Sequence, residues 1–305
     1  MKKILLTGSE GFVGRNLQEA LSRRDDFELC APRQSEINLT DSNDVAKCIE
    51  AFQPDLIIHS ATSNTVGKGY DNDVCEQNLR MFFNLLRYRP PGSLIYTLCS
   101  GSSYNRDSWI PKMPEDYLGT HIPTDSQGFS KFVIASYASH LVDVVTLRIF
   151  GIFGKYEDYR YKFISNTIAK RLAGLEVALF RDAVYDYLDV ADFCEIVEQL
   201  VDRNVRSGEF NVTPDDSIKL SQAIEAVDRC LGISRGYQVI TPGQGKPYTG
   251  CNKKLRAVLK DFQFSPIDVS VQRLVSHYIQ NRHEIDAEAL KTDQLLQHAK
   301  SINSP

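Results

Sequence analysis

A glycine-rich segment near the start of the chain has the spacing of a phosphate-binding turn. Residues 7–14 read TGSEGFVG, between the apolar run 2–7 and a segment with helical spacing. Glycine at 8 permits a tight turn, glycine at 11 lets the backbone approach a pyrophosphate, and glycine at 14 lets the helix pack on the strand. Amides at the helix N-terminus would then face the phosphates, whereas the alternative is an ordinary βα turn. The expected cofactor contacts are Gly8, Ser9, Glu10, Gly11, Phe12 and Val13.

The end of the second predicted strand bears on which dinucleotide binds. NAD sites often have an acidic residue there for the ribose 2′-hydroxyl, whereas an arginine accommodates the 2′-phosphate of NADP. This strand is followed by Pro32-Arg33-Gln34, with no carboxylate before Glu36. Arg33 supplies the planar fork that suits a phosphate, unless it is only a solvated surface arginine. The segment favours NADP(H) over NAD(H).

Apolar periodicity predicts strands and helices that alternate over the first 150 residues. The predicted strands are 2–7, 27–31, 55–59, 93–98 and 143–147, and the predicted helices are 12–22, 42–52, 78–88 and 124–140. Such alternation is typical of an α/β fold with a doubly wound parallel sheet. We expect a Rossmann domain over 1–150 and a smaller C-terminal α+β substrate lobe over 151–283, which can exchange segments with the first. Residues 284–305 are polar and form either a mobile tail or a partner-docking helix.

Composition narrows the class of protein. The chain has 305 residues, 35 basic and 39 acidic side chains, and a formal charge of −4, so it has no basic footprint for nucleic acid. No stretch approaches the roughly 20 apolar residues of a membrane span. Its seven cysteines show no CxxC spacing, which argues against a disulfide framework and a metal site. We expect a cytoplasmic protein without metal, membrane or nucleic-acid partners.

The motifs described above, together with segments further along the chain, resemble those of a known protein family. From Lys3 to about Ile279 the chain resembles the extended short-chain dehydrogenase/reductases, in their NAD(P)-dependent nucleotide-sugar epimerase, dehydratase and reductase branch. The matching segments are TGSEGFVG (7–14), DLIIHSAT (55–62), Asn78, LCSGSSY (98–104), GFSK (128–131), LRIFGIFG (147–154), DYLDVADF (186–193), GEFNV (208–212) and the KKL…FSP run (253–266). Residues 32–41 (PRQSEINLTD) and 64–69 (NTVGKG) are most similar to the GDP-fucose synthases, with the dehydrorhamnose reductases a second similar group.

The resemblance implies a site at which a nicotinamide exchanges hydride with a sugar. The family uses a Ser or Thr, a Tyr and a Lys, the last two spaced YxxxK. Ser100 matches the serine and Lys131 the lysine, but Gln127 occupies the tyrosine position. The resemblance also implies further cofactor contacts beyond the glycine turn and Arg33: Asn38, Leu39, Ser60, Ala61, Thr62, Asn78, Lys131 and Phe150.

Glutamine can donate and accept hydrogen bonds but has no proton to exchange near neutral pH. Three readings follow. Another group donates the proton, such as Ser100 through water, Tyr104 or His121; a substrate hydroxyl or water carries it; or the site binds ligand without turnover. Gln127 also has a structural reading as part of a capping box with Thr124 as N-cap.

The substrate end departs from the family pattern too. The family often has an arginine before its Asp-Tyr-Leu segment to bind the nucleotide diphosphate, and this chain has Tyr185 there. Gly151 takes the place of a frequent asparagine. Arg181 can substitute for the missing arginine or be a surface charge, and the same choice applies to Lys162, Lys170 and Arg171. The expected substrate contacts are Tyr104, Gly151, Lys162, Arg181 and Tyr185.

We therefore expect an NADP(H)-dependent reductase or epimerase acting on a nucleotide-linked sugar. The favoured reaction is reduction of a 4-keto sugar, with Lys131 on the ribose and Ser100 polarising the carbonyl. The alternatives are an inactive ligand-binding member of the same fold and a scaffolding protein. The resemblance also implies a homodimer that pairs the helices carrying Asn78 and Lys131, for which Phe82, Phe83, Leu86, Val133 and Tyr137 supply apolar surface or belong to the core.

Overall fold

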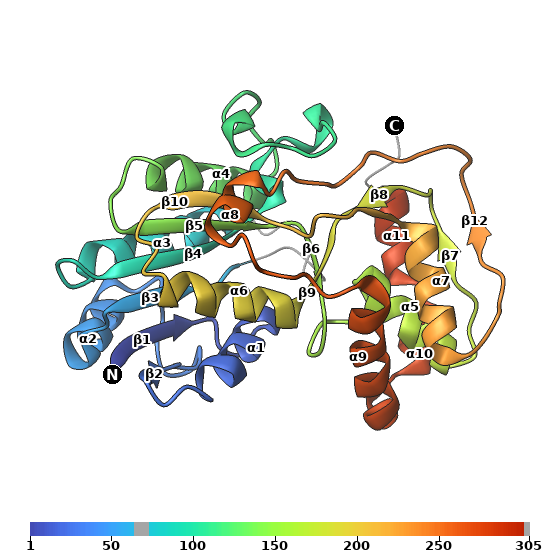
Figure 1. The fold of residues 1–305 in the computed structure, drawn as a ribbon, viewed down its shortest axis with the longest axis horizontal. Coiled ribbons are helices and arrows are strands. Elements are labelled where there is room, and N and C mark those ends of the chain that lie inside the picture. Colours follow the sequence, from blue (N-terminus) through green and yellow to red (C-terminus); the bar gives the residue numbers. More distant parts are fainter. Residues whose placement is uncertain (64–72, 302–305) are drawn as a thin grey trace. The chain divides into compact units, whose positions relative to one another are not determined.

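Five apolar runs of the first 150 residues and one later strand form a parallel six-stranded sheet (Figure 1). Its strand order is β10-β5-β4-β3-β1-β2. The strands are β1 (Lys2–Thr7), β2 (Phe27–Cys30), β3 (Leu56–His59), β4 (Leu94–Ser100), β5 (Val144–Ile149) and β10 (Gly208–Val212). The chain runs from β1 to β2 on one side and then crosses to β3 on the other. This reversal at β1 is the point at which doubly wound sheets bind ligands, outside the carboxyl ends of the strands.

Helices cover both faces of this sheet. The core on one face joins sheet residues such as Leu5, Ile57 and Ile95 to three helices, α2 (Ser42–Phe52), α3 (Val74–Tyr88) and α4 (Ser126–Ala138). On the other face lie α1 (Phe12–Leu21) and α6 (Val190–Asp202). The Tyr96 hydroxyl donates to the carbonyl oxygens of Leu200 and Val205, which ties β4 to the end of α6. Burial on both faces explains why these strands are continuous apolar runs.

The structure, a computed structural model, describes residues 1–63 and 73–301, so the segment NTVGKG at 64–69 lies outside the described residues. The chain divides into two compact units. Unit 1 comprises residues 1–150, 193–213 and 250–262, and unit 2 comprises 151–192, 214–249 and 263–305. The first stretch of unit 1 ends at Phe150, and both units are discontinuous in the sequence. The returning segments add β10 and α8 (Lys253–Val258) to the first unit.

Unit 2 is a small α+β assembly. Its strands form three two-stranded sheets: β6 (Gly151–Phe153) with β9 (Tyr187–Asp189), β8 (Val184–Tyr185) with β11 (Ile218–Lys219), and β7 (Ala178–Leu179) with β12 (Gln238–Val239). Its helices α5 (Phe163–Leu172), α7 (Leu220–Leu231) and α9 (Ile267–Gln280) enclose one apolar core. Short 3₁₀ turns lie in both units. Those of unit 1 are Gly101–Ser103, Arg106–Ser108 and Glu115–Tyr117, and that of unit 2 is Arg282–Glu284.

The C-terminal residues differ from the expected tail. Helices α10 (Ala287–Lys291) and α11 (Gln294–Ser301) belong to unit 2, and Leu290 is 2% exposed. Asp293 pairs with the buried Lys170 of α5, with 2.7 Å between Oδ2 and Nζ. The Tyr159 hydroxyl accepts a hydrogen bond from the Asp286 amide. Residues 284–301 are thus an integral layer of unit 2, held by one buried ion pair and one apolar anchor.

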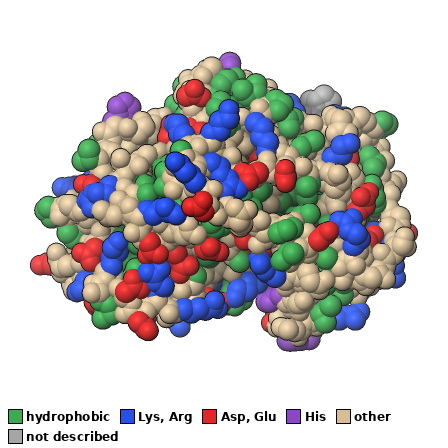
Figure 2. Space-filling view, viewed as in Figure 1, with side chains coloured by type: hydrophobic (Ala, Val, Ile, Leu, Met, Phe, Trp, Pro, Cys, Tyr) green, Lys and Arg blue, Asp and Glu red, His purple; other side chains and the backbone are tan. Residues whose placement is uncertain are grey.

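The surface agrees with the near-balanced composition. On the face drawn in Figure 2, lysine and arginine side chains are interspersed with aspartate and glutamate. Among the described residues, no helix is long and apolar enough to cross a membrane.

Candidate functional site

The glycine turn has the geometry that its spacing predicts. Gly8 has φ +75°, and a Cβ there would lie 2.5 Å from the amide nitrogen of Ala61 at the end of β3. A Cβ on Gly14 would lie 1.9 Å from the Gly8 carbonyl oxygen. At Gly11, by contrast, a Cβ would meet only that same oxygen, at 3.4 Å. Glycine is therefore required at 8 and 14 by packing, whereas position 11 borders open space.

The N-terminus of α1 is open to an anion. Gly11 is its N-cap residue, and no side chain caps the first turn. The uncapped amides and the helix dipole together form the arrangement that binds phosphate groups. A pyrophosphate fits here because position 11 leaves room for it, so the residues present suit a dinucleotide.

Two side chains of the turn fasten it to the segment that follows β2. The Ser9 hydroxyl, 3% exposed, donates to the carbonyl oxygens of Ala31 and Pro32 at 3.2 and 3.0 Å. Glu10 Oε2 accepts a 2.9 Å hydrogen bond from the Gln34 amide. Arg33 itself is exposed. The loop that would receive the adenosine ribose is thereby fixed against the pyrophosphate turn.

Asn78 of α3 organises the chain after β3. Its Oδ1 accepts from the Ser63 amide at 2.8 Å and from the Thr62 hydroxyl at 3.3 Å. Its Nδ2 donates to the Ser63 carbonyl and to the Ser130 hydroxyl of α4, both at 3.1 Å. Asn78 is 1% exposed, so it positions the backbone that borders the site instead of facing a ligand.

Ser100 and Lys131 lie on neighbouring elements, Ser100 at the carboxyl end of β4 and Lys131 on α4. Ser100 is the last residue of β4, and its Oγ accepts from the Ser102 amide at 3.1 Å. Lys131 of α4 donates from Nζ to the Leu98 carbonyl at 3.1 Å and is 7% exposed. A Cβ on Gly128 would lie 2.6 Å from the Ser102 carbonyl oxygen, so only glycine lets α4 approach the serine turn this closely. This close approach packs α4, which carries Lys131, against the turn that follows Ser100.

Lys131 also lies near a histidine that sequence reasoning missed. His59 ends β3, is 3% exposed, and its Nδ1 lies 2.9 Å from the Thr7 hydroxyl. Burial, with a contribution from the Lys131 charge, lowers the pKa of His59 to about 3, so the ring is neutral near pH 7. Burial likewise lowers the pKa of the Lys131 amine. The sequence signal that could have identified His59 is its position at the end of a buried strand, next to the strand that leads into the glycine turn.

Comparison with known proteins identifies the family of this chain. Residues 4–213 match the model of the NAD dependent epimerase/dehydratase family. The chain belongs to this family. The GDP-6-deoxy-D-talose 4-dehydrogenase of Aggregatibacter actinomycetemcomitans is 24% identical over 227 residues, which are 69% of this chain and 74% of that protein.

Solved structures of the family share the fold. A GDP-L-fucose synthetase from Naegleria fowleri bound to NADP superimposes with a TM-score of 0.78 at 14% identity, covering 93% of this chain and 95% of that one. A dTDP-glucose 4,6-dehydratase from Bacillus anthracis in complex with NAD gives 0.74 at 17% identity, covering 93% and 98%. The doubly wound sheet expected from the sequence is therefore confirmed.

Gln127, four residues before Lys131 on α4, is not a capping residue. Helix α4 begins at Ser126, and its N-cap is Asp125, whose Oδ1 accepts from the Gly128 amide at 2.7 Å. The expected capping box with Thr124 is therefore wrong, because the Asp125 carboxylate takes that role. The Gln127 side chain is half-buried, and among the described residues it has no hydrogen-bond partner. Its carboxamide is left available to a ligand.

Tyr104 is locked in the core of unit 1. It is 1% exposed, and its hydroxyl donates to Asn211 Oδ1 and accepts from Arg148 Nη1, both at 3.0 Å. Burial raises the pKa of this phenol well above its usual value. The expectation that Tyr104 donates a proton or lines the sugar pocket does not fit this placement, because the hydroxyl is fully engaged. His121, the other candidate donor, is exposed and packs against the Tyr117 ring.

Three other residues expected at the cofactor contact neighbouring residues of unit 1, two in packing and one in local hydrogen bonds. Leu39 is 8% exposed within the α2–α3 core. Phe150 is 7% exposed and packs edge-on against Trp109, with ring centroids 5.7 Å apart. Asn38 is exposed, and its Oδ1 is used locally by Thr40. Residue type alone could not separate an apolar pocket wall from the core beneath it.

In unit 2, the departures from the family pattern have packing reasons. A Cβ on Gly151 would lie 2.5 Å from the Asp186 carbonyl oxygen, so the pairing of β6 with β9 excludes a larger residue. Tyr185 is half-buried and stacks on Tyr187, with ring centroids 5.7 Å apart and an interplanar angle of 19°. The Tyr248 ring also lies near the Tyr185 ring, with 5.6 Å between the two centroids. Gly151 is thus explained by strand packing, and Tyr185 belongs to a cluster of tyrosine rings at the position where an arginine was expected.

The cations of unit 2 divide into paired and unpaired groups. Lys170 pairs with Asp293, and Arg171 binds both oxygens of Asp228 at 2.8 and 3.0 Å. Both cations are at least 95% buried, which removes them as diphosphate ligands. Lys162 is exposed just before α5. Arg181 has a buried Nε without a hydrogen-bond partner, which makes it the better remaining candidate.

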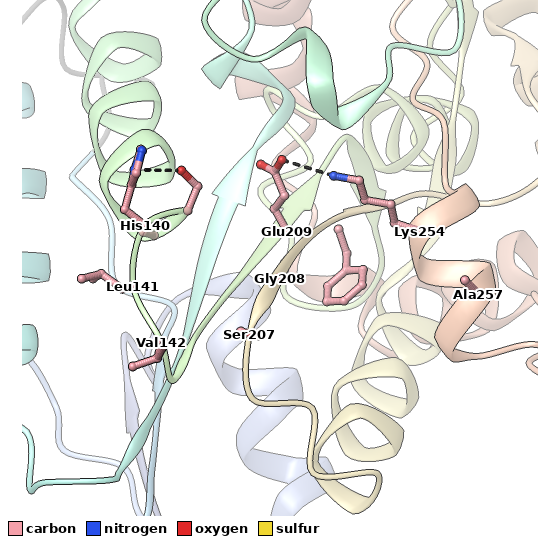
Figure 3. Close-up of a pocket in the computed structure, with 11 residues that line it drawn as sticks. His140, Leu141, Val142, Ser207, Gly208, Glu209, Lys254 and Ala257 are labelled. Atoms are coloured by element: carbon pink, nitrogen blue, oxygen red, sulfur yellow. Dashed lines mark hydrogen bonds and ion pairs between the residues drawn. The ribbon is translucent and has the colours of Figure 1, made fainter.

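A cavity of about 610 Å³ in unit 1 is not the predicted site (Figure 3). It is lined by the end of α4, the start of β10 and α8, and the ion pair of Glu209 with Lys254 lies on its wall. These are the amino ends of the strands, opposite the edge that holds Gly8 and Ser100. None of the residues expected at the site lines it.

Proposed function

We propose that the chain is an NADP(H)-dependent oxidoreductase that reduces a 4-keto nucleotide-linked sugar, or epimerises such a sugar through a keto intermediate. The observation that carries the proposal is the row of groups along one edge of the unit 1 sheet. This row comprises the uncapped α1 N-terminus after β1, the neutral His59 at the end of β3, and Ser100 at the end of β4, with Lys131 of α4 packed beside β4. Arg33 supports a 2′-phosphate because its guanidinium has no partner among the described residues.

The substrate class rests on the relatives. The matching Aggregatibacter protein is named as acting on a GDP-linked 6-deoxy sugar, which favours a GDP-linked substrate here. Arg181 is the proposed contact to the diphosphate, since a buried guanidinium nitrogen without a partner costs free energy until an anion engages it. Lys162, Gly151 and Tyr185 would border the same ligand.

The chemistry needs a hydride and a proton. The nicotinamide supplies the hydride when bound. Ser100 and Gln127 would donate hydrogen bonds to the sugar carbonyl oxygen and stabilise the developing negative charge. Gln127 has no proton to give, so we propose that a water held by Ser100 delivers it to that oxygen. Lys131 holds the ribose and supplies positive charge behind the site.

Two substitutions test this proposal. Gln127→Tyr restores the tyrosine–lysine spacing on α4, and we expect the turnover of a GDP-linked 4-keto sugar to rise, because a positioned acid is worth about 10²–10⁴ in rate. Ser100→Ala should lower turnover about 100-fold. Ser93→Ala is a matched control, since Ser93 is buried at the opposite end of the same strand. Unchanged turnover in both Gln127→Tyr and Ser100→Ala would remove the pair from the mechanism.

The second candidate is an inactive binding protein of the same fold, favoured by the missing tyrosine. Two measurements distinguish the enzyme from the binding protein. Mass spectrometry identifies the ligands retained by the purified protein, and an assay on a panel of keto sugars measures turnover. Retained dinucleotide without turnover, in the wild type and in Gln127→Tyr alike, would favour the binding protein. We also propose a homodimer through α3 and α4, because Phe129 and Tyr137 of α4 are 40% and 48% exposed.

A further inference from the structure

The loop after β2 is held by two carboxylates of the protein itself. Glu10 Oε2 accepts from the Gln34 amide at 2.9 Å, and Glu36 Oε2 accepts from the Arg33 amide at 2.8 Å. Two consecutive backbone donors of the loop are thus already bound to negative charge. Glu10 comes from the glycine turn, so it reaches into the loop from the pyrophosphate side.

This loop is where an adenosine ribose would lie. In βαβ dinucleotide sites, the pyrophosphate rests on the first helix and the ribose on the end of the second strand. A carboxylate there accepts a hydrogen bond from a ribose 2′-hydroxyl, whereas a 2′-phosphate needs cations and amide donors. Here Arg33 is one cation, and Glu10 and Glu36 are two anions on the same short loop.

We propose that Glu10 is a cofactor-specificity residue that lowers the affinity for NADP(H) relative to NAD(H). Its carboxylate occupies the Gln34 amide that a 2′-phosphate would use, and it repels the phosphate. The repulsion is substantial because a phosphate monoester carries nearly two negative charges at pH 7. The same carboxylate is an acceptor for the 2′-hydroxyl of NAD(H). Arg33 attracts the phosphate and Glu10 opposes it, so the selectivity is set by the balance of the two.

Glu10 acts here through charge and not through the shape of the loop. Gln at position 10 keeps an oxygen that accepts from the Gln34 amide, so the loop stays fastened while the charge is lost. Ser9 also continues to hold the Ala31 and Pro32 carbonyls. The inference rests on the proposed cofactor site, and its test therefore measures binding of both dinucleotides.

Isothermal titration of wild type, Glu10→Gln, Arg33→Ala and Glu50→Gln with NADPH and NADH provides that test. Glu50 is an exposed residue of α2, so Glu50→Gln removes the same charge away from the loop. We expect Glu10→Gln to tighten NADPH binding about tenfold, and to leave NADH binding unchanged or to weaken it slightly, since the 2′-hydroxyl loses only the charge of its acceptor. Arg33→Ala should weaken NADPH alone, and Glu50→Gln should change neither. The smaller pair 2′,5′-ADP and 5′-AMP should show the same shift.

The outcomes separate this inference from the proposed function. If Glu10→Gln weakens both dinucleotides equally, or leaves their affinity ratio unchanged, Glu10 is only a fastening of the loop and the inference is overturned. Weaker NADPH binding with unchanged NADH binding overturns it as well, because Glu10 would then position Arg33 for the phosphate. If wild type binds neither dinucleotide, the proposed cofactor site itself fails.

Discussion

Substituting Gly11 with alanine distinguishes a glycine that faces a ligand from one that serves packing. Gly11 has φ −77°, which alanine adopts without strain. Its Cβ would meet only the Gly8 carbonyl oxygen at 3.4 Å, which the neighbour accommodates by a small shift. The restricted unfolded chain adds about 0.4–1 kcal/mol of stability, and the weaker preference of alanine for an N-cap position offsets a similar amount. We therefore expect the free energy of unfolding of Gly11→Ala to stay within about 1 kcal/mol of that of wild type.

Dinucleotide binding, by contrast, should weaken. The added methyl group fills the space beside the uncapped α1 amides that a pyrophosphate would occupy. Losing one hydrogen bond to a charged phosphate costs about 1.5–3 kcal/mol, which raises Kd by roughly 10- to 150-fold. Gly14→Ala is the contrasting variant, because its Cβ would lie 1.9 Å from the Gly8 oxygen and must force the helix away from the turn. It should lower stability by about 1–3 kcal/mol and weaken binding as well.

Urea unfolding and calorimetric titration with NADPH and NADH measure both quantities on the same samples. A Gly11→Ala protein of wild-type stability that binds both dinucleotides with wild-type Kd would refute the reasoning, because no phosphate could then rest on this turn. A loss of more than about 2 kcal/mol in Gly11→Ala would refute the assignment of position 11 to open space, because it exceeds what the N-cap preference explains.

Two further predictions concern unit 2. Burial raises the pKa of Glu157 to about 7, so its protonation stabilises the fold fully below about pH 4.5, and this contribution is lost as the pH rises through 7. Between pH 5 and pH 8, wild type should therefore lose up to about 3 kcal/mol of unfolding free energy relative to Glu157→Gln, which stays neutral, and parallel urea curves for the two proteins would contradict this. Asp293→Asn leaves the buried Lys170 ammonium without its counter-charge and should cost about 3 kcal/mol, whereas Glu288→Gln in the exposed pair with Lys291 should change the melting temperature little; equal effects would show that the C-terminal layer is not anchored there.

The sequence predicted unit 1 well because its strands are buried on both faces. The run at 55–59 stands out between polar turns, and the structure has β3 at Leu56–His59. Helix starts were less certain, since α4 begins after Asp125 and α3 begins at Val74, before the predicted 78. Neighbouring residues such as Thr124 and Asp125 can both cap a helix, and local sequence does not decide between them.

The strands of unit 2 and the discontinuous boundary between the units could not be predicted from the sequence, for a different reason. These strands are two or three residues long, which is too short for an alternating pattern to show. The return of 208–212 to the first sheet depends on its pairing with β5, a contact between residues more than 60 positions apart. At the site, glycine spacing predicted Gly8 and Gly14 because their role is backbone geometry. The burial of Tyr104 and Leu39 depends on tertiary contacts that residue type does not reveal.

Under the proposed function, a glutamine in place of the tyrosine would weaken the site without dismantling it. The parts that would bind the dinucleotide are built from backbone amides and from glycines at 8, 11 and 14, and they do not depend on position 127. The parts that position the reacting groups are also intact, since Gly128 packs on the serine turn and Lys131 donates to the Leu98 carbonyl. A positioned acid contributes about 10²–10⁴ to a rate enhancement that is typically 10⁶ or more. Orientation and preorganised hydrogen-bond donors supply much of the remainder. A chain that keeps the orienting groups and the hydrogen-bond donors but lacks the acid is therefore expected to be a slow enzyme. Restoring one phenol in Gln127→Tyr is the smallest change that should increase its turnover.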